Sequence, residues 1–339
     1  MVTIEDIAKE AGVSSTTVSN VIHGRTNKVS GNTVDLIHEI IRRRGYVPNL
    51  SARALKSRST KLVALINHLD DERREHFFSD PFFISLTGAV EQALREQGYY
   101  LMVRRISERE ELLEFLRNWN VEGIFLPGLF QEDPFYRTLY DLNMPVVLTD
   151  SYVTDLGHMT NIGLQDQEGA RLATEHLIEN GHRRILFASP KIRPGGVVEQ
   201  RLEGYREALW EHGIPFDPSL LRDCEFETDA MMALGREIAG QPDVTAVFAT
   251  ADLLAAGLMA GLQQAGRMVP RDISVVGFDD INWSRMTMPM LTTIHQDADA
   301  KGRLAAECMI QLLEGKPVSQ QNRILPVRLV RRESVRCIR

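Results

Sequence analysis

The chain has 339 residues, of which 43% are hydrophobic and 25% are charged, and its formal net charge is −7. This composition is that of a folded globular protein with room for two or three domains, and it excludes a disordered chain. No apolar run approaches the ~20 residues that cross a bilayer, and the first residues do not resemble a signal peptide, so we expect no membrane partner.

The charge is distributed unevenly along the chain. Residues 1–60 contain nine Lys or Arg against five Asp or Glu, a net charge of +4, whereas residues 61–339 contain 30 against 41, a net charge of −11. A small basic module joined to a large acidic one predicts an anionic partner for the N-terminal part only.

The first 23 residues predict two short helices. Ile4, Ile7, Ala8 and Ala11 recur at helical spacing, and Gly12 ends the pattern. Ser14 is placed to cap a second helix, whose buried stripe consists of Val18, Val21 and Ile22. The other side of this helix carries the small polar residues Ser15, Thr16, Ser19, Asn20 and His23. Two helices joined by a turn that contains glycine, the second with a polar outer face, indicate a helix-turn-helix.

A third helix follows, and then a linking segment. Ser30 is placed to cap the helix and Gly45 to end it. The basic run 42–44 either favours the helix C-terminus electrostatically or contacts phosphate. In residues 47–60, the stretch 52–56 has the length of about one and a half helical turns, too short to be stable alone in water. This segment is either an exposed tether or a hinge helix that orders on DNA.

The rest of the chain, residues 61–339, alternates between strand-like and helical segments. The strand-like runs lack polar alternation, as in strands buried on both faces, and comprise Leu62–Ile66, Gly123–Leu126, Pro145–Leu148, Arg184–Ala188, Ala246–Ala249 and Ile273–Val276. Amphipathic stretches such as 84–97 and 169–180 lie between them. The alternation predicts an α/β fold with parallel sheets, and a break near residues 150–161 divides it into two lobes. The cleft between the lobes is then the expected ligand site.

Several long motifs resemble the lactose/galactose repressor family. They are "TIEDIAKEAGVSSTTVSNVIHG", "GYVPNLSARALKS", "GARLATEHLIENGHRRILF", "RLEGYREAL", "AVFATADLLAAGLMAGLQQAG", "VPRDISVVGFDDI" and "PMLTTIHQD". The resemblance covers nearly the whole chain. It implies a DNA-binding domain at 1–46, a hinge at 47–60 and, at 61–339, an effector-binding and dimerisation domain like the periplasmic sugar-binding proteins.

The resemblance also implies which residues contact DNA. Ser15 and Thr16 occupy the pair that sets operator specificity, while Ala52 and Leu55 match the hinge residues that enter the minor groove and wedge a central base step. The residues assigned to phosphates are Thr3, Ser14, Thr17, Ser19 and Asn27. His23 and Lys56 complete the predicted set.

Asn20 stands where relatives commonly carry arginine. Arginine pairs bidentately with guanine and asparagine with adenine, at about 1–3 kcal/mol of discrimination for each good pair. We therefore predict that the operator carries adenine at the step where relatives have guanine. Footprinting combined with saturation mutagenesis of the operator checks this, and an unchanged preference for guanine contradicts it.

The candidate effector-binding residues combine local chemistry with the resemblance. Asp279 follows the strand-like run "ISVVGF", where a carboxylate accepts two sugar hydroxyls, and Arg201 offers a planar donor fork at the start of its predicted helix. Both match the principal effector-binding residues of the family. Phe82 and Phe83 stand where the family often stacks an aromatic ring on its ligand, although we expect one of them to pack in the core. Trp283 is a further candidate for a wall of the pocket.

Two departures from the family concern this same cleft. The chain has "IGLQDQ", with Gln165, and "FATAD", with Asp252, where many relatives have Asp-Asn and Asn-Asp pairs. We keep Gln165 and Asp252 as candidate contacts, and a sugar, a modified sugar and a non-sugar ligand all stay open. Of the adjacent carboxylates Asp279 and Asp280, we expect one to face the ligand and the other to be structural.

The sequence favours a regulator over the rival classes. Phosphate-binding and hydrolase motifs such as GxGxxG, GxxxxGK[ST], GxSxG and HExxH do not occur, and a periplasmic binding protein would carry a signal peptide and no DNA-binding domain. Cys224, Cys308 and Cys337 have no CxxC spacing, so we expect a reduced cytoplasmic protein without a metal or cofactor.

The interpretation is therefore a homodimeric repressor of a carbohydrate-related operon that binds a pseudo-palindromic operator and is not an enzyme. Effector binding changes the angle between the lobes and thereby DNA affinity. The alternative is a co-repressor type, in which a non-sugar ligand such as a nucleobase strengthens operator binding. The end of the chain carries no leucine heptads, so nothing indicates a coiled-coil tetramer.

Overall fold

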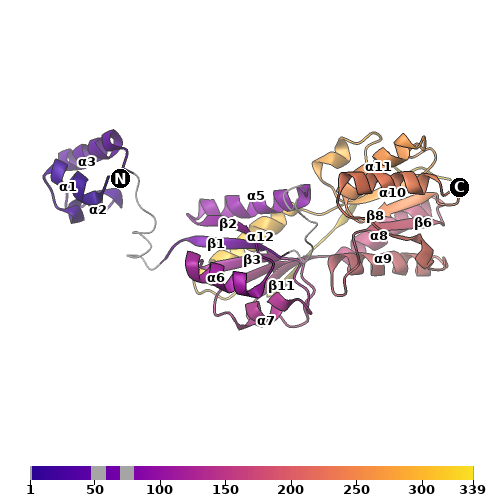
Figure 1. Cartoon of the computed structure of the whole chain (residues 1–339), viewed down its shortest axis with the longest axis horizontal. Coiled ribbons are helices and arrows are strands. Elements are labelled where there is room, and N and C mark those ends of the chain that lie inside the picture. Colours follow the sequence, from indigo (N-terminus) through magenta and orange to yellow (C-terminus); the bar gives the residue numbers. More distant parts are fainter. Residues whose placement is uncertain (1, 47–58, 69–79, 339) are drawn as a thin grey trace. The chain divides into compact units, whose positions relative to one another are not determined.

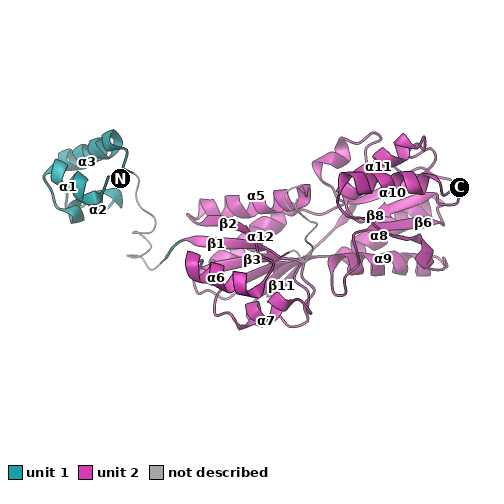
Figure 2. Ribbon diagram, in the orientation of Figure 1, with its two compact units in different colours: residues 1–60 teal, residues 61–339 magenta. Residues whose placement is uncertain are grey.

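The computed structural model describes residues 2–46, 59–68 and 80–338, which form two compact units, residues 1–60 and 61–339 (Figure 2). The predicted hinge contacts Ala52, Leu55 and Lys56 lie outside the described residues.

The first unit contains three helices, α1 (Ile4–Ala11), α2 (Ser15–Ile22) and α3 (Gly31–Arg44). The predicted caps are confirmed: the Ser14 hydroxyl accepts a hydrogen bond from the Thr17 amide, and the Ser30 hydroxyl accepts one from Thr33. Gly45 ends α3 in the left-handed conformation. The three helices bury a small core of Ile7, Ala8, Val18, Val21, Ile37 and Ile40.

The basic run at the end of α3 has an internal partner. Arg43 and Arg44 both bind the carboxylate of Glu10 on α1, Arg44 at 2.6 Å. Arg42 stays on its own helix, where its Nε donates to the His38 carbonyl at 3.4 Å. Two of the three arginines therefore clamp α1 to α3, a role that the sequence analysis did not consider.

The second unit contains two six-stranded sheets (Figure 1). The first sheet has the order β11-β5-β4-β3-β1-β2 and is parallel throughout. Its strands are β1 (Leu62–Asn67), β2 (Tyr100–Arg105), β3 (Gly123–Pro127), β4 (Val146–Thr149), β5 (Thr160–Leu164) and β11 (Asn322–Leu325). The second sheet has the order β12-β10-β9-β8-β6-β7, and only β12 is antiparallel in it. Its strands are β6 (Ile185–Ser189), β7 (Leu221–Asp223), β8 (Ala246–Ala249), β9 (Ser274–Asp279), β10 (Thr292–His295) and β12 (Arg328–Val330).

Helices cover both faces of each sheet, which makes two α/β lobes. The first lobe carries α5 (Pro81–Glu96) and α12 (Ala298–Leu313) on one face and α6 (Arg109–Trp119) and α7 (Pro134–Asp141) on the other. The second lobe carries α8 (Asp166–Glu179) and α9 (Val197–Glu211) opposite α10 (Thr228–Ala239) and α11 (Asp252–Gln264). Two short 3-10 helices, η2 (Pro218–Leu220) and η3 (Asn282–Arg285), complete the elements of this lobe that are described. This arrangement confirms the predicted α/β fold with two parallel-sheet lobes. Strands that are apolar on both sides need helices on both faces of their sheet.

The chain crosses between the lobes three times, from β5 to α8, from β10 to α12 and from β11 to β12. Each lobe is therefore assembled from segments that lie far apart in the sequence. Among the described helices, none combines the length and the apolar character that a membrane span requires.

Candidate functional site: the cleft between the two lobes

A cleft of about 420 Å³ lies between the two lobes of the second unit. Its walls include residues at or just after the carboxyl ends of parallel strands from both sheets, among them Asn67, Asp150, Thr250 and Asp279. Open α/β sheets bind their ligands at this edge.

Asp279 ends β9 and is only 9% exposed. Its Oδ1 accepts a hydrogen bond of 2.6 Å from the Gln296 amide. The pKa of Asp279 is raised to about 7, chiefly by burial; the Arg201 guanidinium opposes this shift and the nearby Asp80 carboxylate adds to it. A carboxylate that is buried at the cleft with one amide donor suits ligand hydroxyls.

Arg201 lies on α9 and is 7% exposed. The helix begins at Val197, so Arg201 lies one turn inside it. The prediction from the sequence that Arg201 opens the helix is therefore wrong. Its Nε donates to Asp166 at 2.8 Å, its Nη1 donates to the Thr250 carbonyl at 2.5 Å, and its plane stacks 3.5 Å from the centre of the Phe278 ring. Three fixed partners hold this guanidinium rigidly at the wall of the cleft.

A chain of polar contacts joins the two lobes beneath the cleft. The Lys301 ammonium, which is fully buried, binds Asp150 at 2.6 Å and donates to the Gln296 side-chain carbonyl at 3.0 Å. Because Gln296 also donates to Asp279, the contacts run from the end of β4 to the end of β9. Burial raises the pKa of Asp150, and Lys301 opposes that shift. A second contact links the lobes where the Tyr152 hydroxyl donates to Asp166 at 2.5 Å.

Two of the carboxylates that line the cleft belong to residues with left-handed backbone conformations. Asp150 has a φ of 51° and Asp279 a φ of 122°. Non-glycine residues rarely adopt positive φ, and such residues gather at functional sites where the surrounding fold supports the strain. The turn after each strand therefore directs a carboxylate to the cleft.

Aromatic rings form part of the cleft wall. Phe82 lies in the first turn of α5, and the Lys301 ammonium is 5.2 Å from the centre of its ring. Phe83 borders the cleft and also packs in the core of the first lobe, 6% exposed. Phe130 and Phe226 add two further rings, and Arg193 lies 5.8 Å from the centre of the Phe130 ring. Apolar rings combined with a few fixed polar groups are typical of small-molecule sites.

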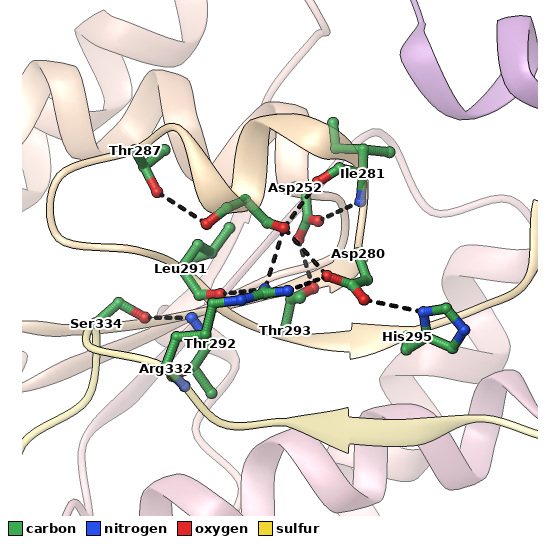
Figure 3. A network of polar contacts seen from close by, with 11 residues as sticks. Asp252, Asp280, Ile281, Thr287, Leu291, Thr292, Thr293, His295, Arg332 and Ser334 are labelled. Carbon is green, nitrogen blue, oxygen red and sulfur yellow. Dashed lines mark hydrogen bonds and ion pairs between the residues drawn. The ribbon is translucent and has the colours of Figure 1, made fainter.

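Asp252 and Asp280 belong to a network behind the cleft wall (Figure 3). Asp252 is fully buried and accepts hydrogen bonds from the Ile281 amide at 3.0 Å and the Thr293 hydroxyl at 2.5 Å. Asp280 binds Arg332 and accepts from His295 at 2.9 Å and from Ser284 at 3.2 Å. These carboxylates fix the turns around the end of β9. Of the adjacent pair, Asp279 borders the cleft, whereas Asp280 is held by the side chains of Arg332, His295 and Ser284.

The structure does not bring every predicted effector contact to the cleft. Among the described residues, those that line it include Phe82, Phe83, Arg201 and Asp279 but not Gln165, Asp252 or Trp283. Gln165 precedes α8 and is exposed, and Trp283 lies on η3 and is 46% exposed. Resemblance placed these side chains near the cleft, but the local backbone directs them elsewhere.

Several polar residues at or beneath the cleft were not singled out from the sequence. Among them are Asn67, Asp150, Thr250, Gln296 and Lys301. For Asn67, Asp150 and Thr250 the available signal was a polar residue at the end of an apolar strand. Gln296 and Lys301 carried no local signal, because only the crossing from β10 to α12 brings them to this place.

In the first unit, the polar residues of α2 form an accessible face. Ser15 and Thr16 are exposed at its first turn, and Ser19 and Asn20 are partly exposed one turn later. His23 Nδ1 donates to the Ser19 carbonyl at 2.6 Å, which fixes the ring at the helix end. Thr3 and Ser14 cap α1 and α2 and stay exposed, as does Asn27 after α2. Short polar side chains at a helix N-terminus suit contacts to nucleic acid.

Polar groups at the cleft that make hydrogen bonds within the protein include the carboxylates of Asp150 and Asp279, the Arg201 guanidinium and the Gln296 amide, and such groups recognise polar ligands. Within the ranges that the structure describes, no cluster of His, Cys, Asp and Glu has the geometry of a metal site. Cys224 and Cys308 are buried and Cys337 is exposed, all three as free thiols.

Both units match known protein families. Residues 3–49 match the family described as "Bacterial regulatory proteins, lacI family", and residues 174–335 match the "Periplasmic binding protein-like domain". The HTH-type transcriptional regulator CelR of Thermobifida fusca is 35% identical over 98% of both chains. The ribose operon repressor of Halalkalibacterium halodurans is 31% identical over 99% of this chain and 98% of its own.

Solved structures agree along nearly the whole chain. The CelR–cellobiose complex superposes with a TM-score of 0.72 at 31% identity and covers 98% of this chain and 100% of its own. The lac repressor dimer bound to operator and the anti-inducer ONPF superposes with a TM-score of 0.83 at 26% identity, over 99% of both chains. The three-helix unit, the two-lobed unit and these full-length similarities together show that the chain belongs to the lacI family of bacterial transcription regulators.

Proposed function

We propose that this protein is a repressor whose affinity for its operator is controlled by a neutral saccharide bound in the cleft. The observation that carries the proposal is the arrangement of Asp150 and Asp279, two largely buried carboxylates from the two lobes of one cleft, each at or just after the end of a strand. Carboxylates in this setting accept hydrogen bonds from hydroxyl groups of a ligand.

The charges beneath the cleft support a neutral ligand over an anionic one. The buried cations Arg201 and Lys301 are already paired with Asp166 and Asp150. A phosphate or carboxylate beside Asp279 would meet a like charge, and the two buried cations near it are already paired, which is unfavourable in a buried site. Lys191 and Arg193 also line the cleft but are not buried. Hydroxyl groups meet no such penalty.

Two relatives support the class of ligand. The CelR structure contains cellobiose, and a lacI-family regulator from Enterococcus faecium, 27% identical over 82% of this chain and 100% of its own, contains ribose. Both ligands are uncharged and rich in hydroxyl groups.

The first unit supplies the DNA interface in this proposal. Ser15, Thr16 and Asn20 on α2 contact base edges, and His23 lies at the end of the same face. The caps Thr3 and Ser14, together with Thr17, Ser19 and Asn27, contact phosphates. By similarity to the lac repressor dimer on its operator, two copies bind a pseudo-palindrome. We assign the protein to the cytoplasm, where its DNA lies, and assign it no reaction.

The experiment is selection of genomic fragments by the full-length protein at ~150 mM salt, followed by mobility shifts on the recovered site with and without a set of neutral mono- and disaccharides. We expect one short pseudo-palindrome and at least one saccharide that changes its retention. Asp279→Ala should retain the operator but lose the response.

Recovery of only non-specific DNA, in the presence and absence of the saccharides, contradicts the repressor assignment. A response only to charged ligands or nucleobases contradicts the saccharide. If ligand strengthens operator binding, the protein is of the co-repressor type, and if ligand weakens it, the protein is released by an inducer.

A further inference from the structure

Two buried polar atoms at the cleft have no hydrogen-bond partner among the residues that the structure describes. They are Asn67 Nδ2, whose residue is 3% exposed, and Thr250 Oγ1, whose residue is 2% exposed. Both residues line the cleft. Their backbones are fixed, because the Asn67 carbonyl accepts from the Ile106 amide at 3.0 Å and the Thr250 amide donates to Ala188 at 2.9 Å. Only the side-chain groups are left unpaired.

The two residues lie beside the point where strand order reverses in each lobe, Asn67 at the end of the first strand of its sheet and Thr250 just after the third strand of its own. Without the edge strands β11 and β12, each sheet has the order 2-1-3-4-5 in its own numbering, so strand order reverses between β1 and β3 in one lobe and between β6 and β8 in the other. Asn67 ends β1, and Thr250 directly follows β8. Doubly wound sheets bind ligands at this reversal point. Topology alone thus places each unpaired atom at the expected ligand position of its lobe.

An unpaired buried polar group is destabilising. Leaving a buried donor or hydroxyl unsatisfied costs about 1–3 kcal/mol. The neighbouring polar side chains are satisfied: Arg201, Lys301 and Gln296 each have protein partners at 2.5–3.0 Å. The cleft therefore keeps two groups, one in each lobe, that a bound ligand can satisfy.

We propose that Asn67 and Thr250 are specificity-determining contacts for the effector, one from each lobe. This inference rests on the proposed function of the cleft as the effector site. The Asn67 amide donates to a ligand oxygen, the Thr250 hydroxyl pairs with a second hydroxyl, and Asp279 accepts from a third. The ligand class is a neutral polyhydroxylated ring with hydroxyl groups on the edges that face each lobe. A ring that lacks one of these groups leaves a buried donor unpaired and is rejected.

The test replaces each group by an apolar side chain of similar size. Asn67→Leu and Thr250→Val remove the unpaired groups, so the ligand-free variants should melt at the wild-type temperature or above it. We expect the dissociation constants for neutral saccharides, with cellobiose and ribose in the set, to rise about 10- to 100-fold in calorimetric titration of the full chain. Thr250→Ser, which keeps the hydroxyl, should retain affinity within a few-fold.

Thr87→Val is the matched control. Thr87 Oγ1 on α5 is also buried and unpaired, but Thr87 does not line the cleft, so this variant should bind saccharides like the wild type. A monodeoxy saccharide that lacks the hydroxyl group paired with Asn67 or Thr250 should bind the wild type weakly. The variant that lacks that same protein partner should bind this analogue no more weakly than the wild type does. Unchanged affinity in both Asn67→Leu and Thr250→Val overturns the inference and leaves the proposed function intact. A wild type that binds no saccharide of the set overturns both.

Discussion

Asp279 and Asp280 are neighbours in the chain but have opposite environments. Burial raises the pKa of Asp279 to about 7. Burial also acts on Asp280, but the hydrogen bond and charge of Arg332, together with His295 and Ser284, hold the pKa of Asp280 below its usual range. The Asp279 carboxylate therefore remains available to a ligand, whereas the charge of the Asp280 carboxylate is balanced by Arg332.

This difference predicts a pH dependence of stability. A group whose pKa rises from 3.8 to about 7 on folding contributes stability below pH 3.8, and this contribution is lost as the pH rises through about 7. Compared with the permanently neutral Asp279→Asn, the ligand-free wild type should lose about 3 kcal/mol of unfolding free energy between about pH 5 and pH 8. Urea unfolding of both proteins measures the difference.

Asp280→Asn is the control for this comparison. Because the lowered pKa of Asp280 keeps it charged throughout that range, the difference between the wild type and Asp280→Asn should not change with pH. A constant difference for Asp279→Asn would show that its carboxylate does not titrate there.

At the level of elements, α8 and α9 pack closely enough to position the cleft. A Cβ on Gly204 of α9 would lie 1.9 Å from the Gln167 carbonyl of α8. One turn earlier, Arg201 reaches across to Asp166 at the start of α8. The close helix contact and the ion pair that holds the cleft arginine therefore depend on the same spacing between helices.

Gly204→Ala should force these helices apart. We expect a loss of about 1–3 kcal/mol in unfolding free energy through overpacking, together with weaker saccharide binding because Arg201 moves. Gly235→Ala is the matched control: its Cβ would lie 2.3 Å from the Leu258 carbonyl between α10 and α11, away from Arg201. It should lose similar stability but keep saccharide affinity. Equal affinity in both variants would contradict the role of this spacing.

The sequence predicted those parts of the fold that depend on neighbouring residues. Ser14 and Ser30 were identified as caps, and the apolar runs as strands, because capping and periodicity are local. The pairing of Lys301 with Asp150 could not be predicted, because the two residues are 151 positions apart and meet only through a crossing between lobes. Asp252 was placed at the cleft by resemblance to the family, which does not indicate on which side of the wall its carboxylate lies.

In the whole molecule, the buried Lys301 holds the link between the lobes. It lies on α12, binds Asp150 after β4 and contacts Gln296 in the crossing from β10. Through Gln296 the same contacts reach Asp279 in the second lobe. A change at the ligand carboxylate is thereby connected to a segment on which both lobes depend.

Lys301→Met should destabilise the second unit by about 3–5 kcal/mol, because it leaves the Asp150 carboxylate buried and unpaired. Combining it with Asp150→Asn should recover most of that loss, because no unpaired charge is then left buried and asparagine tolerates the positive φ of this position. Urea unfolding of the single and double variants measures both effects. A double variant no more stable than Lys301→Met would show that the ion pair is not the source of the loss.

The three crossings between the lobes also determine the order in which a newly made chain becomes functional. Residues 1–46 are contiguous and include a complete three-helix core, so this unit can fold as soon as it leaves the ribosome. The first lobe must wait, because β5 gains its outer partner only when Asn322–Leu325 has been made, and α12 also arrives late. During synthesis the DNA-binding unit therefore folds before the effector-binding unit that regulates it is complete. A protein chain that is truncated within the second lobe would contain a folded three-helix unit that no effector can regulate.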